Sequence, residues 1–426
     1  MNRVVGGNGI LGVITPTVRV SSVAVADETE VVAVVAGGSR LAEAARRCWD
    51  EGRAILPVNP GFTAPEVTTL LARLRPTHVV ADDDRLDERL TKLGRASAYP
   101  GGLPAPAGTA AIVVTSGTEG MPKGVELTRS GMEVMGRGYS AGLGAGAGDR
   151  WLACLPLHHV ASLGALARSY VTGVPCTVHD GFDIEQVARS PRAEATTIVS
   201  LVPTAIRRLL DAGAPLHEFR LVISGGAPCP PALRARAEAT GVVVVDAYGL
   251  SETWGGFALD GIPIDGAEVQ LAGDDEIIVR GPMLMRGYRL DPARTDAVVD
   301  DDGWFHTGDV GTIDPDGRVG VIDRLKDLVI TGGVNVSPTE VEGVLAHHPD
   351  VDDVCVVGVP DDEWGELVVA YVVPRSGARP PSVDELREFG RDRLSGPKLP
   401  RAARAVDAIP RTASGKPLRR LLRETP

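Results

Sequence analysis

The sequence predicts an α/β fold, with a large N-terminal domain built on a doubly wound parallel sheet and a small α+β domain at the C-terminus. Up to about residue 255, short runs rich in Val and Ile alternate with longer stretches rich in Ala, Leu and Arg. Strands that alternate with helices are typical of a parallel sheet covered on both faces. The predicted strands are 31–35, 111–114, 197–202, 221–224 and 242–246, and the predicted helices are 42–49, 64–74, 204–212 and 231–239.

The pattern changes twice after residue 255. Closely spaced strands with turn signals, at 267–271 and 276–280, predict a β-rich subdomain over about 256–325. From residue 326 onward the sequence predicts a compact α+β unit, with helices at 338–347 and 383–394 and strands at 351–359 and 367–373. We therefore expect a large domain over 1–325 and a small domain over 326–426.

Composition excludes several classes of partner and site. A formal charge of −12, with no basic run interleaved with aromatic residues, argues against nucleic acid as a partner. The five cysteines are scattered and lack CxxC spacing, so we expect free thiols in a reducing cytosol rather than disulfides or a zinc site. No apolar run reaches membrane-spanning length and no signal-peptide pattern is present, so we expect a cytoplasmic protein without membrane insertion.

Lysine is rare in this chain, and its positions are informative. The sequence holds five lysines against 39 arginines, and four of the five are Lys123, Lys326, Lys398 and Lys416, which lie in motifs suited to phosphate or carboxylate chemistry. A compact ammonium and a planar guanidinium suit different sites. The rarity of lysine therefore marks these four positions as candidate binding or catalytic residues, and the surrounding motifs must indicate the role of each.

The sharpest local signal is the segment TSGTEGMPKG, which runs from Thr115 to Gly124 after the apolar strand at 111–114. Its hydroxyls and glycines present donors to phosphate oxygens without Cβ obstruction, and its lysine adds a mobile charge. The register is not that of a Walker loop, because Gly124 follows the lysine. The alternative is a flexible surface loop, but the combination favours phosphate binding. The residues expected to bind are Thr115, Ser116, Gly117, Thr118 and Lys123.

This loop resembles the nucleotide-binding signature of adenylate-forming enzymes, which include acyl-CoA synthetases, peptide-synthetase adenylation domains and luciferases. Further segments resemble the family's motifs in the family's order: SGGAP at 224–228, DAYGLSET at 246–253, GWFHTGD at 303–309, DR at 323–324, GGVN at 332–335 and SGK at 414–416. The resemblance covers nearly everything from about residue 52. The shortened N-terminal region resembles that of some short actinobacterial o-succinylbenzoate–CoA ligases.

The resemblance implies an ATP site in the large domain. Ser251 would contact phosphate and Glu252 would help to hold Mg²⁺. A Ser251 cap of a helix N-terminus is the alternative, and both roles could hold at once. Asp309 would accept hydrogen bonds from the ribose hydroxyls, and Arg324 would also contact the ribose. The loop of Gly225, Gly226, Ala227 and Pro228 would form the adenine side, and Tyr248 would pack near the adenine. Asp246, Ala247 and Gly249 would also bind the nucleotide.

The resemblance also implies a mobile C-terminal domain. Lys326 falls at the family's hinge, and Gly332 and Gly333 would admit the pantetheine arm of coenzyme A. Lys416 corresponds to the family's adenylation lysine, whose ammonium would stabilise charge on the α-phosphate mainly in the transition state. The alternative, a solubilising lysine in a tail, is weak in a chain with so few lysines.

The segment LPLHHV at 155–160 resembles the family's aromatic-His segment, with His158 in the place of the aromatic residue. His159 would gate the acyl pocket, and a core or capping histidine is the alternative. The absence of an Asp in this segment disfavours an amino-acid substrate, and Arg168 could pair with a second carboxylate. Small and apolar side chains would line the pocket and favour a bulky or aromatic acid: His159, Ala161, Ser162, Leu163, Val202, Gly226, Gly249 and Gly255.

The implied activity is that of an ATP-dependent carboxylate–CoA ligase that uses ATP, Mg²⁺ and coenzyme A. An acid and ATP would give acyl-AMP and pyrophosphate, and the acyl group would then pass to CoA with release of AMP. Three alternatives stay open: an enzyme that loads a carrier protein, a member that performs one half-reaction, and a non-catalytic binding protein. A homodimer is also left open.

Overall fold

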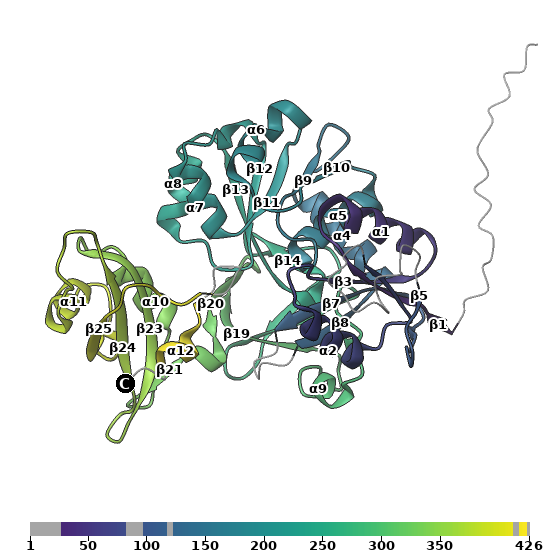
Figure 1. Ribbon diagram of the computed structural model, residues 1–426. Coiled ribbons are helices and arrows are strands. Elements are labelled where there is room, and N and C mark those ends of the chain that lie inside the picture. Colours follow the sequence, from purple (N-terminus) through teal and green to yellow (C-terminus); the bar gives the residue numbers. More distant parts are fainter. Residues whose placement is uncertain (1–26, 82–96, 117–121, 412–416, 424–426) are drawn as a thin grey trace, which may run out of the picture.

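The computed structural model describes residues 27–81, 97–116, 122–411 and 417–423. These residues form two seven-stranded sheets, a four-stranded sheet, a five-stranded sheet and the antiparallel pair of β1 (Glu28–Thr29) and β6 (Ala105–Pro106). Figure 1 shows a large body and a smaller lobe, which the C-terminal residues form. The α/β fold expected from the sequence is confirmed, but its parallel strands are divided between two sheets.

The first seven-stranded sheet has the strand order β18-β8-β7-β3-β2-β4-β5. Strands β2, β3, β4 and β7 pair in parallel, whereas β5, β8 and β18 are joined antiparallel to their neighbours. The edge strand β18 comes from a segment far later in the chain. The strands are β2 (Val31–Val35), β3 (Ala54–Val58), β4 (His78–Ala81), β5 (Ser97–Ala98), β7 (Thr109–Ser116), β8 (Pro122–Thr128) and β18 (Gly287–Tyr288).

The second seven-stranded sheet has the order β10-β9-β11-β12-β13-β14-β15. Its first five strands pair in parallel, and β14 and β15 are added antiparallel. The strands are β9 (Trp151–Ala153), β10 (Cys176–Val178), β11 (Ile198–Leu201), β12 (Leu221–Gly225), β13 (Val243–Leu250), β14 (Gly255–Leu259) and β15 (Ile262–Pro263).

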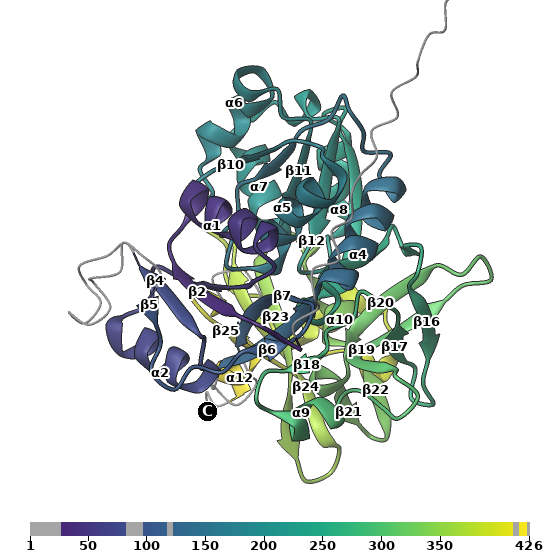
Figure 2. The ribbon, with the colours of Figure 1, turned by 90° about the vertical axis from the view of Figure 1, so that its right-hand side faces the viewer.

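Side-chain alternation along β2 explains the layers, because successive residues of a strand point to opposite faces. Val31, Ala33 and Val35 belong to the core beneath α2 (Ala64–Leu74), whereas Val32 and Val34 belong to the core between the two sheets. Helices α1 (Gly38–Asp50), α4 (Arg129–Gly142) and α5 (Val160–Thr172) fill that middle layer. Helices α6 (Ile184–Glu194), α7 (Pro203–Asp211) and α8 (Pro231–Glu238), with the short η1 (Leu216–Glu218), cover the second sheet. Figure 2 shows the second sheet above the first.

The expected β-rich segment is a four-stranded antiparallel sheet in the order β16-β17-β19-β20. It lies between the large body and the C-terminal lobe in Figure 1. The short η2 (Ser251–Thr253) precedes it and α9 (Pro292–Asp296) interrupts it. Its strands are β16 (Glu268–Leu271), β17 (Glu276–Arg280), β19 (Phe305–Ile313) and β20 (Val319–Arg324).

The C-terminal lobe follows η3 (Leu325–Asp327) and has its own sheet and core. The two helices expected at 338–347 and 383–394 are present in shorter form, as α10 (Pro338–Leu345) and α11 (Val383–Gly390). The remaining elements are β21 (Val329–Thr331), β22 (Val334–Val336), β23 (Val351–Asp361), β24 (Gly365–Pro374), η4 (Gly396–Lys398), β25 (Ala402–Ala405) and α12 (Arg419–Arg423).

Candidate active site

The phosphate motif lies on a β-hairpin of the first sheet. Strands β7 and β8 pair antiparallel, with Thr115 opposite Lys123, so Lys123 is a strand residue and not the loop residue that the motif suggested. The Thr115 hydroxyl is buried, and it has no hydrogen-bond partner among the residues that the structure describes. Ser116 ends β7. Gly117 and Thr118, which the sequence also assigned to phosphate, lie outside the described residues.

Lys123 meets the candidate metal-binding carboxylate directly. Its Nζ donates hydrogen bonds to Oε1 of Glu252 at 3.0 Å and to the hydroxyl of Tyr288 at 2.6 Å. The Tyr288 hydroxyl donates to the same Oε1 at 2.8 Å, which closes a triangle of three side chains. Burial, and then the charge of Glu252, raise the pKa of Tyr288, so its hydroxyl stays protonated and remains a donor.

Glu252 is well placed to keep a fixed position, because it is only 6% exposed and lies in η2 at the end of β13. Ser251 is the first residue of this short helix, and the cap position is Leu250, so the alternative of a Ser251 cap is wrong. The Leu250 backbone N–H instead donates to the hydroxyl of Thr253 at 2.9 Å.

The three side chains assigned to the ribose and its neighbourhood are also brought together. The Tyr248 hydroxyl donates to Oδ2 of Asp309 at 2.8 Å, and Nε of Arg324 lies 2.6 Å from Oδ1 of the same carboxylate. Arg324 faces Asp309 because the two are register partners across β19 and β20. Burial and the neighbouring carboxylate of Asp309 raise the pKa of Tyr248. The carboxylate is therefore held from both sides.

A second carboxylate holds the loop that carries Asp309. Glu276, at the start of β17, accepts a hydrogen bond from the Gly308 backbone N–H at 2.7 Å, and its other oxygen lies 2.7 Å from Nδ1 of His306. The Thr307 hydroxyl donates to the Ile277 carbonyl at 2.6 Å. These bonds fix the segment immediately before Asp309 against β17.

The residues assigned to adenine lie at the ends of β12 and β13. Gly226 has a φ of +78°, a conformation that favours glycine, and a Cβ there would lie 3.5 Å from Val202. Asp246 pairs with Arg234, whose Nη1 lies 2.9 Å from its Oδ2, and the same nitrogen bonds Asp260. Burial raises the pKa of Asp246 despite that arginine. Gly225 is the last residue of β12, Ala227 and Pro228 follow that strand, and Ala247 lies in β13.

The candidate acyl region lies where α5 begins. His159 is the N-cap residue of α5, without a side-chain cap bond, and its ring lies 4.3 Å from that of His158, centroid to centroid. Burial lowers the pKa of His159, and it lowers that of His158 to about 4, so both rings are neutral at neutral pH. A Cβ on Gly255 would lie 3.9 Å from Val160, which places β14 beside the start of α5.

The other expected pocket residues differ in exposure. Gly249 pairs with Gly256 across β13 and β14, and a Cβ at Gly249 would collide with the Gly255 carbonyl oxygen at 1.6 Å. Ala161 is half-buried on α5, whereas Ser162 and Leu163 are almost fully buried, Leu163 in the core between the sheets. Leu163 therefore offers no open surface to a ligand.

Arg168 lies in the core and not on an open surface. It is 3% exposed, and its guanidinium stacks between the rings of Tyr139 and Trp151, at 4.3 and 4.6 Å from their centroids. Within the described ranges its Nε has no hydrogen-bond partner. These cation–π contacts give Arg168 a packing role, and its pairing with a second carboxylate stays a prediction.

A hollow of about 330 Å³ lies at the junction with the C-terminal lobe, lined by Gly308, Arg324, Leu325 and Lys326. It joins the ribose-side loop to the expected hinge, because Lys326 lies in η3 directly after β20. Across this hinge, Oδ2 of Asp323 accepts hydrogen bonds from the Ser337 hydroxyl at 2.7 Å and from the Thr339 backbone N–H at 2.9 Å. The carboxylate therefore ties β20 to the first turn of α10.

The glycine loop of the small lobe is the exposed turn between β21 and β22. Gly332 and Gly333 have φ values of +57° and +77°. A Cβ on Gly332 would lie 3.1 Å from the ring of Trp364, whereas a Cβ on Gly333 would meet nothing within 4 Å. Only Gly333 therefore faces open space. Lys416 lies outside the described residues, and Lys398 bonds both carboxylate oxygens of Glu340 at 2.6 and 2.7 Å.

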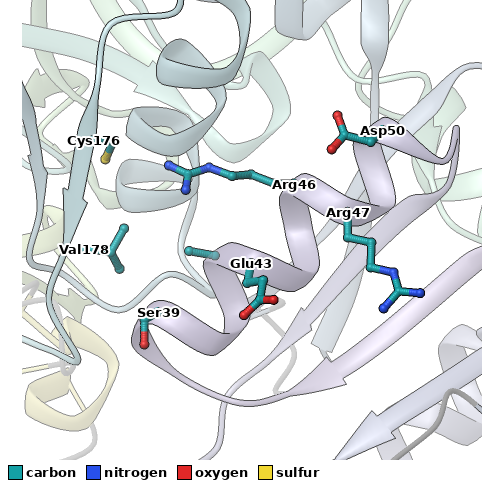
Figure 3. Close-up of a pocket in the computed structure, with 8 residues that line it drawn as sticks. Ser39, Glu43, Arg46, Arg47, Asp50, Cys176 and Val178 are labelled. Carbon is teal, nitrogen blue, oxygen red and sulfur yellow. The ribbon is translucent and has the colours of Figure 1, made fainter.

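A second hollow, of about 430 Å³, lies away from these residues, between α1 and β10. Figure 3 shows Arg46 extending from α1 towards Cys176 and Val178, while Arg47 points away. It contains none of the residues that the sequence singled out as a site. The candidate active site therefore remains the region of β8, β13 and β19.

Sequence reasoning missed Tyr288, Glu276 and Asp323 as members of these networks. Tyr288 touches residues 36 and 165 positions away, and no local pattern marks such a contact. Glu276 gave a weak signal, since it is a carboxylate at the start of the apolar run EIIVR. Asp323 lay within the recognised DR pair, but its partners lie 14 and 16 residues further on.

The described residues hold no other feature that changes this assignment. The five cysteines are free thiols, as expected. In the described ranges, no three His, Cys, Asp or Glu side chains gather as a metal site. Within the same ranges, a helix long and apolar enough to cross a membrane is absent.

Comparison with known proteins supports the same family. The model of the AMP-binding enzyme family matches residues 27–289, and that of its C-terminal domain matches residues 340–416. A 2-succinylbenzoate–CoA ligase of Bacillus licheniformis is 38% identical over 336 residues, which cover 74% of this chain and 69% of the relative. A feruloyl-CoA synthase of an Amycolatopsis species is 36% identical over 335 residues, which cover 72% of this chain and 68% of the relative.

Solved structures agree with these sequence relatives. The o-succinylbenzoate CoA synthetase of Bacillus subtilis in complex with the acyl-adenylate OSB-AMP is 28% identical, with a TM-score of 0.81, covering 94% of this chain and 89% of that one. ATP-bound MatB from Rhodopseudomonas palustris is 26% identical, with a TM-score of 0.81, covering 93% and 89%. This chain belongs to the AMP-binding enzyme family.

Proposed function

We propose that the protein is an ATP-dependent carboxylate–CoA ligase that activates a bulky or aromatic acid as acyl-AMP and transfers the acyl group to coenzyme A. One observation carries the proposal. Side chains from β8, β13, η2, β19 and β20 form two networks, one with an ammonium and a carboxylate, the other with a carboxylate held by Tyr248 and Arg324, and β13 leads from the second into η2 of the first. The first suits phosphates with a cation, and the second suits a ribose.

In the proposed first half-reaction, a carboxylate oxygen of the acid bonds to the α-phosphorus of ATP, and pyrophosphate leaves. Lys123, Ser251 and Lys416 surround the phosphates, and Lys416 stabilises the developing negative charge on the α-phosphate. Glu252 fits Mg²⁺, because one buried carboxylate is the usual protein share of a magnesium site that phosphates and water complete. Bound there, Mg²⁺ would neutralise charge on the phosphate oxygens.

In the proposed second half-reaction, residues 326–426 turn about Lys326 as one domain and present Gly332 and Gly333 to the large domain. The thiol sulfur attacks the acyl carbon, AMP leaves with the former carboxylate oxygen, and the thiol proton is lost to solvent. The exposed turn and its left-handed glycines suit the close approach of a thin pantetheine arm. Domain closure excludes water from the reactive anhydride.

An aromatic acid is the substrate class that the pocket and the relatives favour. The relatives named above act on 2-succinylbenzoate and ferulate, by their names, and both are aromatic carboxylates. In this chain, the neutral ring of His159 and the half-buried Ala161 lie at the start of α5, where an aromatic ring would contact apolar and uncharged groups. The adenine side is proposed at Gly225, Gly226, Ala227, Pro228 and Tyr248, and Asp246, Ala247 and Gly249 are proposed to bind the nucleotide beside it.

The test is pyrophosphate release from the purified protein with Mg·ATP and a panel of aromatic, fatty and polycyclic acids. We expect release with at least one aromatic acid, and a CoA thioester by mass spectrometry when CoA is added. If pyrophosphate is released and a holo-carrier protein is loaded, but no CoA thioester forms, the carrier protein and not CoA is the acyl acceptor. No release with any acid would contradict the proposal. Sedimentation of the same sample reports whether the chain forms a homodimer.

A further inference from the structure

Tyr288 is the member of the phosphate-side triangle that no motif assigned. Its ring is 5% exposed, and it lies on the two-residue strand β18, opposite Val125 of β8. The main chain around it is tied to Glu252 and to the residue that follows Lys123. The Met285 N–H donates to the Glu252 carbonyl at 2.7 Å, and the Arg289 N–H donates to the Gly124 carbonyl at 2.8 Å. Tyr288 is therefore fixed by its backbone, whatever its hydroxyl does.

The hydroxyl of Tyr288 satisfies two charged groups at once. It accepts a hydrogen bond from Nζ of Lys123 and donates one to Oε1 of Glu252. Nζ also lies 4.1 Å from the centroid of the tyrosine ring. Oε1 of Glu252 therefore accepts hydrogen bonds from both Tyr288 and Lys123. Among the residues that the structure describes, Oε2 of Glu252 has no hydrogen-bond partner.

A plain packing role would not need this hydroxyl. The Lys123–Glu252 contact is already direct at 3.0 Å, and a phenylalanine ring would fill the same space. A hydrogen bond to a charged group contributes more than one between neutral groups. The hydroxyl therefore has an energetic role that acts through the orientation of the two charged side chains.

We infer that Tyr288 is a positioning residue for the adenylation step: its hydroxyl occupies Oε1 of Glu252, leaves Oε2 for the cation that accompanies ATP, and holds Lys123 beside it. This inference rests on the proposed function. When the triphosphate enters, Lys123 moves its hydrogen bonds to phosphate oxygens, and the tyrosine keeps Glu252 in place. The ribose and adenine side, around Asp309 and Tyr248, does not depend on Tyr288.

The test compares the affinity of Tyr288→Phe for two nucleotides by titration calorimetry. Mg·ATP uses both networks, whereas AMP lacks the β- and γ-phosphates and the cation. We expect the dissociation constant of Mg·ATP to rise about tenfold, the scale of one lost hydrogen bond to charged groups. The dissociation constant of AMP should stay within about twofold of the wild-type value, because the ribose side is intact.

Tyr170→Phe is the matched control. Tyr170 lies on α5, outside both networks. Its hydroxyl also donates a hydrogen bond to a carboxylate, Oδ1 of Asp50, at 2.9 Å. It should leave the affinities for both nucleotides unchanged. In a Glu252→Gln background, adding Tyr288→Phe should raise the dissociation constant of Mg·ATP by less than about a further twofold, because the two residues act together.

The outcomes separate this inference from the proposed function. Equal weakening of Mg·ATP and AMP in Tyr288→Phe, or an unchanged affinity for Mg·ATP, overturns the positioning role. A full tenfold effect that persists in the Glu252→Gln background also overturns it. A wild-type protein that binds AMP but not Mg·ATP would overturn the proposed function and this inference with it.

Discussion

The two halves of the candidate site, one in the large domain and one in the small lobe, differ in how far their residues are already bonded to neighbouring protein groups. In the large domain, Lys123, Glu252 and Asp309 are bonded to neighbouring side chains. In the small lobe, Gly332 and Gly333 form an exposed turn, flanked by Ile330 at 56% and Val334 at 40% exposure. The difference matches the roles that we propose: a preformed nucleotide site in the large domain, and a turn that meets an outside partner, coenzyme A.

We expect the largest effect from Lys416→Ala, which removes the small lobe's proposed contribution to adenylation. Acyl-AMP formation should fall by about 10³-fold, the scale of one lost charge-stabilising group. Thioester formation from synthetic acyl-AMP should change by less than about threefold, because that step does not use the ammonium. Rapid-quench assays of each half-reaction measure both values. Equal losses in the two steps would contradict the assigned role.

Gly333→Leu tests the other half of the comparison. The left-handed φ of +77° strains any branched residue, and the side chain would stand in the proposed path of the pantetheine arm. Thioester formation should fall by about 10²-fold, with adenylation changed less than about threefold. Gly377→Leu is the control, because Gly377 has a φ of +82° and open space in the same lobe. Similar losses of thioester formation in both variants would show that backbone strain, and not a blocked path for the pantetheine arm, causes the effect.

A smaller effect is expected at the junction of the two halves. Asp323→Ala removes the carboxylate that accepts hydrogen bonds from the Ser337 hydroxyl and the Thr339 backbone N–H across the expected hinge. Trypsin should then cut near Lys326 about tenfold faster, because local opening becomes easier by the strength of those bonds. Asp353→Ala, which breaks an ion pair with Arg411 within the lobe, serves as the control. An unchanged cleavage rate in Asp323→Ala would show that other contacts hold the lobe.

The smallest effect concerns pH and the large domain. The pKa of His158 is about 4 in the folded protein, against an ordinary value near 6.5, because of burial and then its neighbour His159. Between these values the unfolded chain binds more protons, so the free energy of unfolding falls as the pH drops from about 6.5 to about 4. We expect His158 to contribute about 1 kcal/mol of this loss, since its ring is only partly buried. Urea titrations of His158→Phe should show a flatter dependence, and an identical slope would contradict the assignment.

The sequence predicted the alternation of strands and helices and the family better than it predicted the contacts. Val31 to Val35 form a strand with both faces buried, which an unbroken apolar run indicates. The division into two sheets was not predicted, because parallel and antiparallel partners such as β18 come from distant segments. Motif order located Glu252 and Asp309, since each motif is local.

The rest depended on long-range packing. Tyr288 joins Lys123 and Glu252 across 165 and 36 residues, and only the folded chain shows it. Lys123 was expected in a loop because glycines surround it, but pairing with β7 extends the strand through that residue. Backbone pairing overrode local composition there.

The most direct test of the central claim follows one oxygen atom. The protein is incubated with Mg·ATP, CoA and an accepted aromatic acid whose two carboxylate oxygens are ¹⁸O, and the AMP is analysed by mass spectrometry. An acyl-AMP intermediate predicts one ¹⁸O atom in each AMP, because a carboxylate oxygen bonds to the α-phosphorus and leaves with it. AMP without ¹⁸O, formed while the thioester accumulates, would contradict the proposed mechanism.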